Sequence, residues 1–131
     1  MLKSNRRGFI FMNKKILNWF LVIIWAGFIF FLSHQTGLKS NLPNEYDLIL
    51  RKLAHISEYA ILTFLLIRAL SGYNLKSKKI LILSVFLSLL YAFSDEYHQS
   101  FILERVGAFH DIGIDSIGIF LVWLKYRKML K

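Results

Sequence analysis

The chain has 131 residues, enough for one domain, and 56% of them are hydrophobic against 19% charged. Its mean hydropathy of +0.48 suits a membrane protein better than a water-soluble domain. In a soluble protein, a net charge of +9 would suggest that the partner is nucleic acid. Here the basic residues lie between apolar segments, as in membrane proteins. We therefore exclude nucleic acid and expect membrane lipids as partners. The absence of cysteine excludes disulfides and thiolate chemistry.

The first part of the chain predicts a basic arm followed by a membrane crossing. Residues 1–15 form the arm, and Met12 within it is a second candidate for the first residue. The uncharged segment Ile16–Ser33 is about as long as a transmembrane helix. A signal peptide also begins with positive charge and an apolar run. No pair of small residues suited to cleavage precedes His34, so we expect an uncleaved helix.

Three further apolar segments follow, at Leu53–Leu70, Ile80–Phe93 and Ile112–Leu124. A polar connection, 34–52, precedes the second segment, and a short basic turn, 71–79, precedes the third. The third segment is short for a crossing, so a buried core helix is its alternative interpretation. The apolar fragments within 101–109 are too short to cross, which predicts a loop at the membrane interface between the third and fourth helices.

Together these segments predict an all-α integral membrane bundle of four transmembrane helices over residues 16–124, with a basic tail at 125–131. The positive-inside rule places both termini in the cytoplasm. Under this topology the cytoplasmic side holds 13 of the 17 cationic residues, namely Lys3, Arg6, Arg7, Lys14, Lys15, Arg68, Lys76, Lys78, Lys79, Lys125, Arg127, Lys128 and Lys131. All 8 acidic residues and all 4 histidines fall on the outer side.

A polar stripe marks the start of the second apolar segment. Lys52, His55, Glu58 and Tyr59 have spacings that place them near one face of a helix. His55 and Glu58 can hydrogen-bond to each other or share a metal. The alternative, which we favour from these residues alone, is a buried ion pair that orders helix packing, because polar groups within membranes often join helices.

A second polar group ends the third segment, where Asp95 precedes His98 and Gln99 by one helical turn. A carboxylate beside a histidine can fix its tautomer, so His98 becomes a candidate general acid or base, or a ligand. The alternative is a helix cap exposed to solvent. Glu96 is expected on another face, in contact with solvent.

The fourth segment begins with Asp111 and Asp115. Asp111 suits the positive end of the helix dipole and needs no functional role. Asp115 lies one turn deeper, so we expect it to be neutral or paired with Arg105, Lys52 or a histidine. Gly118, which follows, permits close approach of a neighbouring helix.

Three other features bear on chemistry. Arg105 suits bidentate binding of a carboxylate or phosphate, and its structural alternative is pairing with one of the aspartates. The histidines and carboxylates are adequate as metal ligands, yet no metal-binding motif is present, so no metal is predicted and the cofactor stays unknown. Nearby serines, none in the context of a nucleophile elbow, are Ser57, Ser94, Ser100 and Ser116.

The type, order and spacing of these polar residues resemble the VanZ-like family of small membrane proteins. The motifs concerned are Lys52-x-x-His55-x-x-x-Tyr59-x-x-Leu62, then Asp95-Glu96-x-His98-Gln99, then Arg105, then Asp111-x-x-x-Asp115-x-x-Gly118. The resemblance covers residues 32–124. It implies a helical protein of the bacterial cytoplasmic membrane with a polar site. The founding member of the family is linked to low-level teicoplanin resistance in Gram-positive bacteria.

We therefore expect a polar site open to the outer leaflet, lined by His55, Glu58, Asp95, His98, Gln99, Asp111 and Asp115, with Lys52 and Arg105 meeting an anionic group. Three hypotheses follow. The first is a non-catalytic envelope protein that binds or shields an anionic lipid or cell-wall precursor. The second is a membrane enzyme acting on a lipid or precursor head group. The third gives the polar residues a structural role alone.

Overall fold

The computed structural model describes residues 2–34, 44–101 and 109–130, and it describes side chains for 14–33, 45–101 and 112–128. All regular structure in these ranges is helical, which confirms the prediction of an all-α fold with four α-helices. The elements are α1 (Leu2–His34), α2 (Asn44–Leu70), α3 (Ser77–Gln99), α4 (Phe109–Tyr126) and the short 3-10 helix η1 (Arg127–Leu130).

The helices extend beyond the apolar segments that predict them. α1 takes in the basic arm, and α2 begins at Asn44, within the stretch expected to be a polar connection. The first turn of α2 carries Glu45 and Asp47, whose negative charges suit the positive end of the helix dipole. α3 has 23 residues, which removes the objection that the third segment is too short to cross a membrane.

Three helices are long and apolar enough to cross a membrane, over Lys14–Ser33, Glu45–Leu70 and Ser77–Gln99. Their outer surfaces, and that of α4, expose many large apolar side chains, including Phe20, Ile23, Phe31, Phe86 and Phe120. A soluble protein rarely exposes contiguous apolar surface on this scale, whereas lipid tails solvate it readily. Composition, helix length and surface therefore agree on a multi-pass membrane protein.

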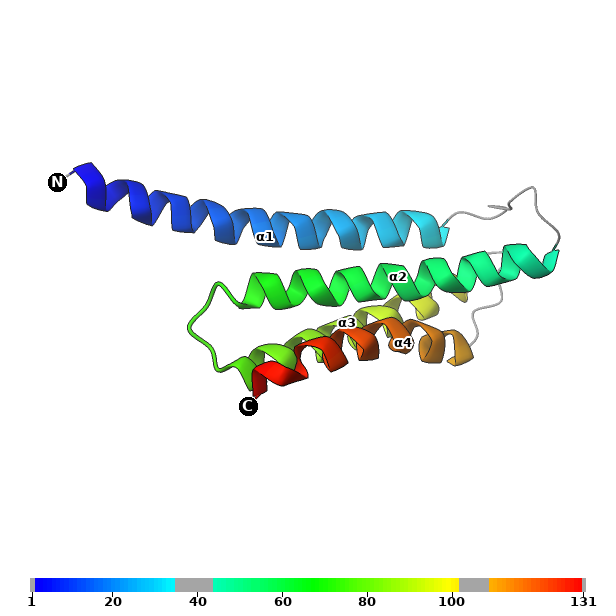
Figure 1. The fold of residues 1–131 in the computed structure, drawn as a ribbon. Helices are drawn as coiled ribbons and strands as arrows, with labels where there is room; N and C mark the ends of the chain where they lie inside the picture. Colours follow the sequence, from blue (N-terminus) through cyan, green and yellow to red (C-terminus); the bar gives the residue numbers. More distant parts are fainter. Residues whose placement is uncertain (1, 35–43, 102–108, 131) are drawn as a thin grey trace.

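The four helices run roughly alongside one another and alternate in direction (Figure 1). α2 contacts α1, α3 and α4, and is the central element of the bundle. The beginning of α1, the α2–α3 turn and the end of the chain lie at one end of the bundle. The opposite end gathers the end of α1, the start of α2, the end of α3 and the start of α4.

The bundle core is built around the inward face of α2. Tyr59, Leu62 and Leu66 are buried there with Ile29 of α1 and Ile119 of α4. Small polar side chains support the packing of α2 on α3, since the hydroxyl oxygens of Thr63 and Ser88 are 2.8 Å apart in the interior. Such pairs are favoured in membranes because they let helices approach closely while satisfying both hydroxyls.

α1 is joined to the rest of the bundle by two aromatic side chains that bond to backbone. The indole nitrogen of Trp25 donates to the carbonyl of Glu58 in α2 at 2.9 Å. The hydroxyl of Tyr91 in α3 donates to the carbonyl of Ala26. Because most of the outer face of α1 is exposed, these bonds fix its rotation and register against α2 and α3.

Gly118 sets the distance between α2 and α4. A Cβ atom placed there would collide with the backbone carbonyl of Ile56 and lie 3.0 Å from the backbone nitrogen of Ala60. Backbone atoms of a helix cannot rotate away as the end of a side chain can. Glycine is therefore required at this crossing, as expected for the closest helix contacts in membranes.

We expect Gly118→Ala to destabilise the protein by about 1–3 kcal/mol or more, because the added methyl group must push α4 away from α2. Gly113→Ala is the matched control, since a Cβ at Gly113 meets nothing within 4 Å. The measurement is the unfolding midpoint of each purified variant in detergent. Equal midpoints for the two variants would contradict the assigned crossing.

Candidate functional site

Six polar side chains from three helices gather at the bundle end opposite the chain termini. We call them the polar cluster: His55, Glu58 and Tyr59 of α2, Asp95 and Gln99 of α3, and Asp115 of α4. α2 and α4 begin at this end of the bundle, and α3 ends there. The alternating helix directions therefore bring together polar residues that are far apart in the sequence.

One half of the polar cluster is a hydrogen-bonded group centred on Asp95. The hydroxyl of Tyr59 donates to Asp95 Oδ2 at 3.1 Å, and the side-chain amide of Gln99 donates to the same oxygen at 3.3 Å. Tyr59 is fully buried and Asp95 is 4% exposed. The carboxylate thus receives two donors inside the protein, which joins α2 to α3 and offsets the loss of water around its charge.

The other half centres on the imidazole of His55, which lies between two carboxylates. His55 Nδ1 is 3.4 Å from Asp115 Oδ1 and 3.6 Å from Glu58 Oε2. Asp115 is completely buried, and Glu58 is buried as well. Burial of a carboxylate in a medium of low polarity is strongly unfavourable without a partner, so His55 supplies the polar contact that lets Asp115 sit inside the bundle.

Two sequence predictions at the end of α3 are wrong. Asp95 does not orient His98: its bonding oxygen is taken by Tyr59 and Gln99, while the ring of His98 lies 4.5 Å from the ring of Phe30 in α1, centroid to centroid. Residues three apart on a helix differ by about 60° in direction, enough for the two side chains to face different helices. Glu96 is not in solvent, because it is only 5% exposed.

The alternative interpretation of this helix end, a cap exposed to solvent, does not hold for Asp95 and Gln99, since both are buried. Lys52, by contrast, is exposed one turn before His55 and stands at the rim of the cluster. Arg105 and most of the expected interfacial loop lie outside the described residues, and so does the side chain of Asp111. His55 is one of the partners expected for Asp115, and the structure brings these two together.

Two chemistries considered from the sequence can be compared with the structure. The hydroxyls of four serines donate to backbone carbonyls three or four residues earlier, an arrangement that activates none of them as a nucleophile. They are Ser57, Ser94, Ser100 and Ser116. Within the described ranges, no group of three or more acidic or histidine side chains has a geometry suited to a metal ion. The contacts within the polar cluster include the two hydrogen bonds to Asp95 and the approach of His55 to two carboxylates.

Tyr59 is the member of the polar cluster whose role the sequence understated. The sequence places Tyr59 in the polar stripe, four residues after His55, but predicts no role for it in the site. Its position on the same helix face as His55 is the signal that could have placed it there. Only the packing of α2 on α3 shows that its hydroxyl is directed at Asp95.

An apolar, four-helix arrangement with buried carboxylates and histidine at one end defines a helical multi-pass membrane protein with an internal polar cluster. The VanZ/LLP1 family model matches residues 18–130, and the chain belongs to this family. Searches of curated proteins and of solved structures gave no match.

The Tyr59–Asp95 hydrogen bond can be measured with a double-mutant cycle. We expect Tyr59→Phe and Asp95→Asn each to destabilise the protein by about 1–3 kcal/mol, because each leaves a buried polar partner with fewer bonds. The double variant should lose less than the sum, by a coupling of about 0.5–3 kcal/mol. Tyr97→Phe, on the exposed face of α3, is the control and should leave stability unchanged. Strictly additive losses would show that the two side chains do not interact.

Proposed function

We propose that this chain is a multi-pass protein of the bacterial plasma membrane that binds the head group of an envelope lipid or cell-wall precursor at the polar cluster, and thereby lowers susceptibility to glycopeptides such as teicoplanin. In this proposal α4 is the fourth crossing, both termini are cytoplasmic and the polar cluster opens toward the outer leaflet. The observation that carries the proposal is the convergence of buried carboxylates and a histidine from three helices at one end of the bundle.

The distribution of charge supports this orientation. In the described ranges the end with the chain termini carries Lys14, Lys15, Arg68, Lys76, Lys78, Lys79, Lys125, Arg127 and Lys128. The described acidic residues lie toward the other end, apart from Glu58, which is midway along α2. Basic residues beside transmembrane helices are retained on the cytoplasmic side. The acidic end would then face the cell exterior, where cell-wall precursors are used.

The depth of the polar cluster also fits a head group that enters from one surface. If the hydrocarbon core, about 30 Å thick, starts near Arg68, it ends about 20 residues earlier, near Leu48. His55 then lies about 10 Å inside the membrane, reckoned at 1.5 Å per residue. A polar group at this depth can be reached from the interface without crossing the bilayer midplane.

The chemistry of the polar cluster favours a particular kind of head group. Carboxylates only accept hydrogen bonds, so Glu58, Asp95 and Asp115 match the hydroxyl, amide or amine donors of a sugar or peptide. Lys52 at the rim is placed to meet a phosphate that links such a group to its lipid. A glycosylated or peptide-bearing lipid phosphate carries both kinds of group.

The topology can be tested with reporter fusions in the host cell. We expect a reporter enzyme fused after Lys131 to behave as cytoplasmic, and one inserted near Pro43 to behave as external, because basic flanks resist translocation. The reverse pattern would turn the polar cluster toward the cytoplasm and remove the proposed role at the cell surface.

The proposed function can be tested with His55→Asn and Asp115→Asn, each expressed in a Gram-positive host and compared with the unaltered chain for teicoplanin susceptibility. We expect both variants to lose at least half of any protection and to bind a labelled lipid-linked cell-wall precursor more than tenfold more weakly, because each removes one member of the central pair. Ser57→Ala, exposed on α2, is the control.

Folded yield in detergent must be measured for the same variants. Loss of protection at normal yield supports a binding site. Collapse of the yield in both variants, with normal protection per folded molecule, would assign the polar cluster a structural role alone and overturn the proposal.

A second candidate function is favoured by one observation. His55 Nδ1 lies within 3.6 Å of two carboxylates, an arrangement that can hold a proton donor or acceptor in a fixed orientation. On this alternative the protein is a membrane enzyme that acts on the head group, with His55 as the acid or base in place of His98. Turnover of the labelled precursor by the purified protein, abolished in His55→Asn, would select the enzyme. Binding without turnover would reject it.

A further inference from the structure

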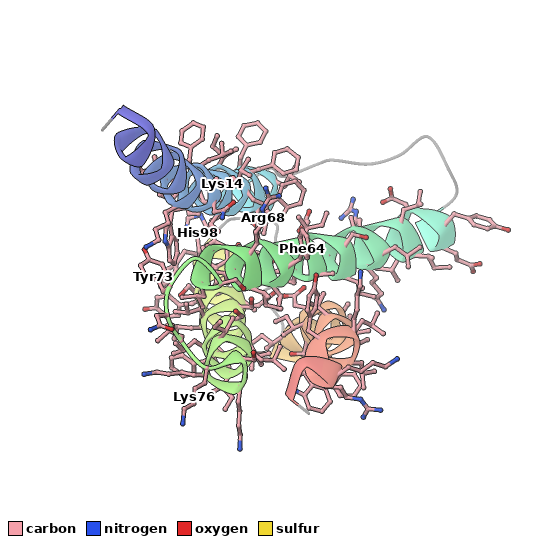
Figure 2. All side chains as sticks on the ribbon, turned by 60° about the vertical axis from the view of Figure 1, so that its left-hand side comes forward. Lys14, Phe64, Arg68, Tyr73, Lys76 and His98 are labelled. Carbon is pink, nitrogen blue, oxygen red and sulfur yellow. The ribbon has the colours of Figure 1, made fainter. Side chains whose placement is uncertain are left out.

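The end of the bundle that holds the chain termini carries a dense and unbalanced positive charge. Figure 2 views the molecule from this side and labels Lys14, Arg68, Tyr73 and Lys76. Lys14, Arg68 and Lys76 are exposed, and so are the lysines that follow on α3 and the basic residues after α4. Within the described ranges no salt bridge involves any of these cations.

One group at this end has a defined geometry, which we call the Tyr73 group: Lys15 and Trp19 of α1 with Tyr73 of the α2–α3 turn. The indole nitrogen of Trp19 donates to the Tyr73 hydroxyl at 2.9 Å. The ammonium nitrogen of Lys15 lies 4.8 Å from the centre of the Tyr73 ring. A Cβ at Gly72 would lie 3.2 Å from Cγ of Lys15, so the lysine side chain runs closely over the turn.

The Tyr73 hydroxyl retains a donor. It accepts the proton of Trp19, and within the described ranges no acceptor takes its own proton. Tyr73 is 43% exposed, so this donor is accessible from the interface. A hydroxyl donor beside a lysine ammonium provides hydrogen bonding and positive charge at one point, which are the requirements for a phosphate oxygen.

The position of the Tyr73 group within the membrane narrows the ligand further. Lys14 and Lys15 begin the first candidate span, and the α2–α3 turn joins the second to the third, so the group lies where the hydrocarbon ends. Tryptophan, tyrosine and lysine are enriched at this level because they meet lipid head groups. Phospholipid phosphates are present there at high concentration, and a cluster of lysine and arginine next to transmembrane helices selects lipids with net negative charge.

We propose that the basic end is a binding site for an anionic phospholipid, with the phosphate held by the Tyr73 hydroxyl and Lys15, and with Lys14 and Arg68 supplying the preference for net negative charge. The occupant is a lipid of the leaflet at this end of the bundle. This lipid is separate from the head group proposed for the polar cluster. The inference depends neither on the function proposed for that cluster nor on which end of the bundle faces the cytoplasm.

The experiment uses the full chain in nanodiscs that contain equal amounts of phosphatidylglycerol and phosphatidylcholine. After release into the gas phase, native mass spectrometry counts the lipids of each kind retained by the protein. We expect the unaltered chain to retain phosphatidylglycerol in preference, and the preference to fall as salt is raised.

Two variants test the assigned residues. We expect Lys14→Gln combined with Arg68→Gln to lower the preference for phosphatidylglycerol by about fivefold for each cation removed. Tyr73→Phe should lower total retention by about fivefold, because it removes the hydroxyl that donates to phosphate, together with the acceptor of the Trp19 indole nitrogen. Circular dichroism and elution profile show whether each variant is folded, and both exposed cations can be replaced singly if the double variant is not.

The control is Arg51→Gln, which removes one positive charge at the opposite end of the bundle and should leave retention unchanged. It is matched to Lys14→Gln and to Arg68→Gln, each made singly. Three results would overturn the inference: equal retention of the two lipids by the unaltered chain, an equal effect of the control, or no effect of Tyr73→Phe. Binding of RNA or of a soluble protein at this end in place of lipid would overturn it as well.

Discussion

The constraint on which the structure depends is that ionisable groups inside a membrane must satisfy one another. Asp115 is buried without exposure to solvent, and the imidazole of His55 on the neighbouring helix approaches it to 3.4 Å. Lipid offers no hydrogen bonds to replace those of water, so an isolated carboxylate at this place would cost several kcal/mol. The positions of α2 and α4 are therefore fixed by this pair at one level and by the Gly118 crossing at another.

The same constraint explains why α2 is central. Its inward face presents His55 to Asp115 of α4, and Tyr59 to Asp95 of α3. The apolar side chains that follow on this face form the bundle core. A single helix thus carries both the polar partners and the apolar contact surface, and rotation of α2 by one residue would break both. This coupling gives the polar cluster a rigid support, which a binding or catalytic site requires.

The fold could be read from the sequence more fully than the polar cluster. Four apolar segments predict four helices but place the helix ends too far inward, because residues such as Glu45 and Asp47 look like a loop when hydrophobicity alone is read. The contact between His55 and Glu58 follows from spacing within one helix. Pairing of His55 with Asp115, and of Tyr59 with Asp95, depends on how helices pack, which one sequence does not contain. The predicted Asp95–His98 pair is wrong for the same reason.

The central claim, that side chains from separate helices converge at one end of the bundle, can be measured by cross-linking in native membranes. The chain has no cysteine, so a cross-link within a variant can join only the introduced pair. A monofunctional maleimide first shows that each single cysteine reacts, including the buried Asp115→Cys. A short bifunctional maleimide should then join His55→Cys to Asp115→Cys efficiently and should fail to join Ser57→Cys, on the exposed face of α2, to Asp115→Cys. Absence of the first cross-link, or equal yields for the two pairs, would contradict the convergence.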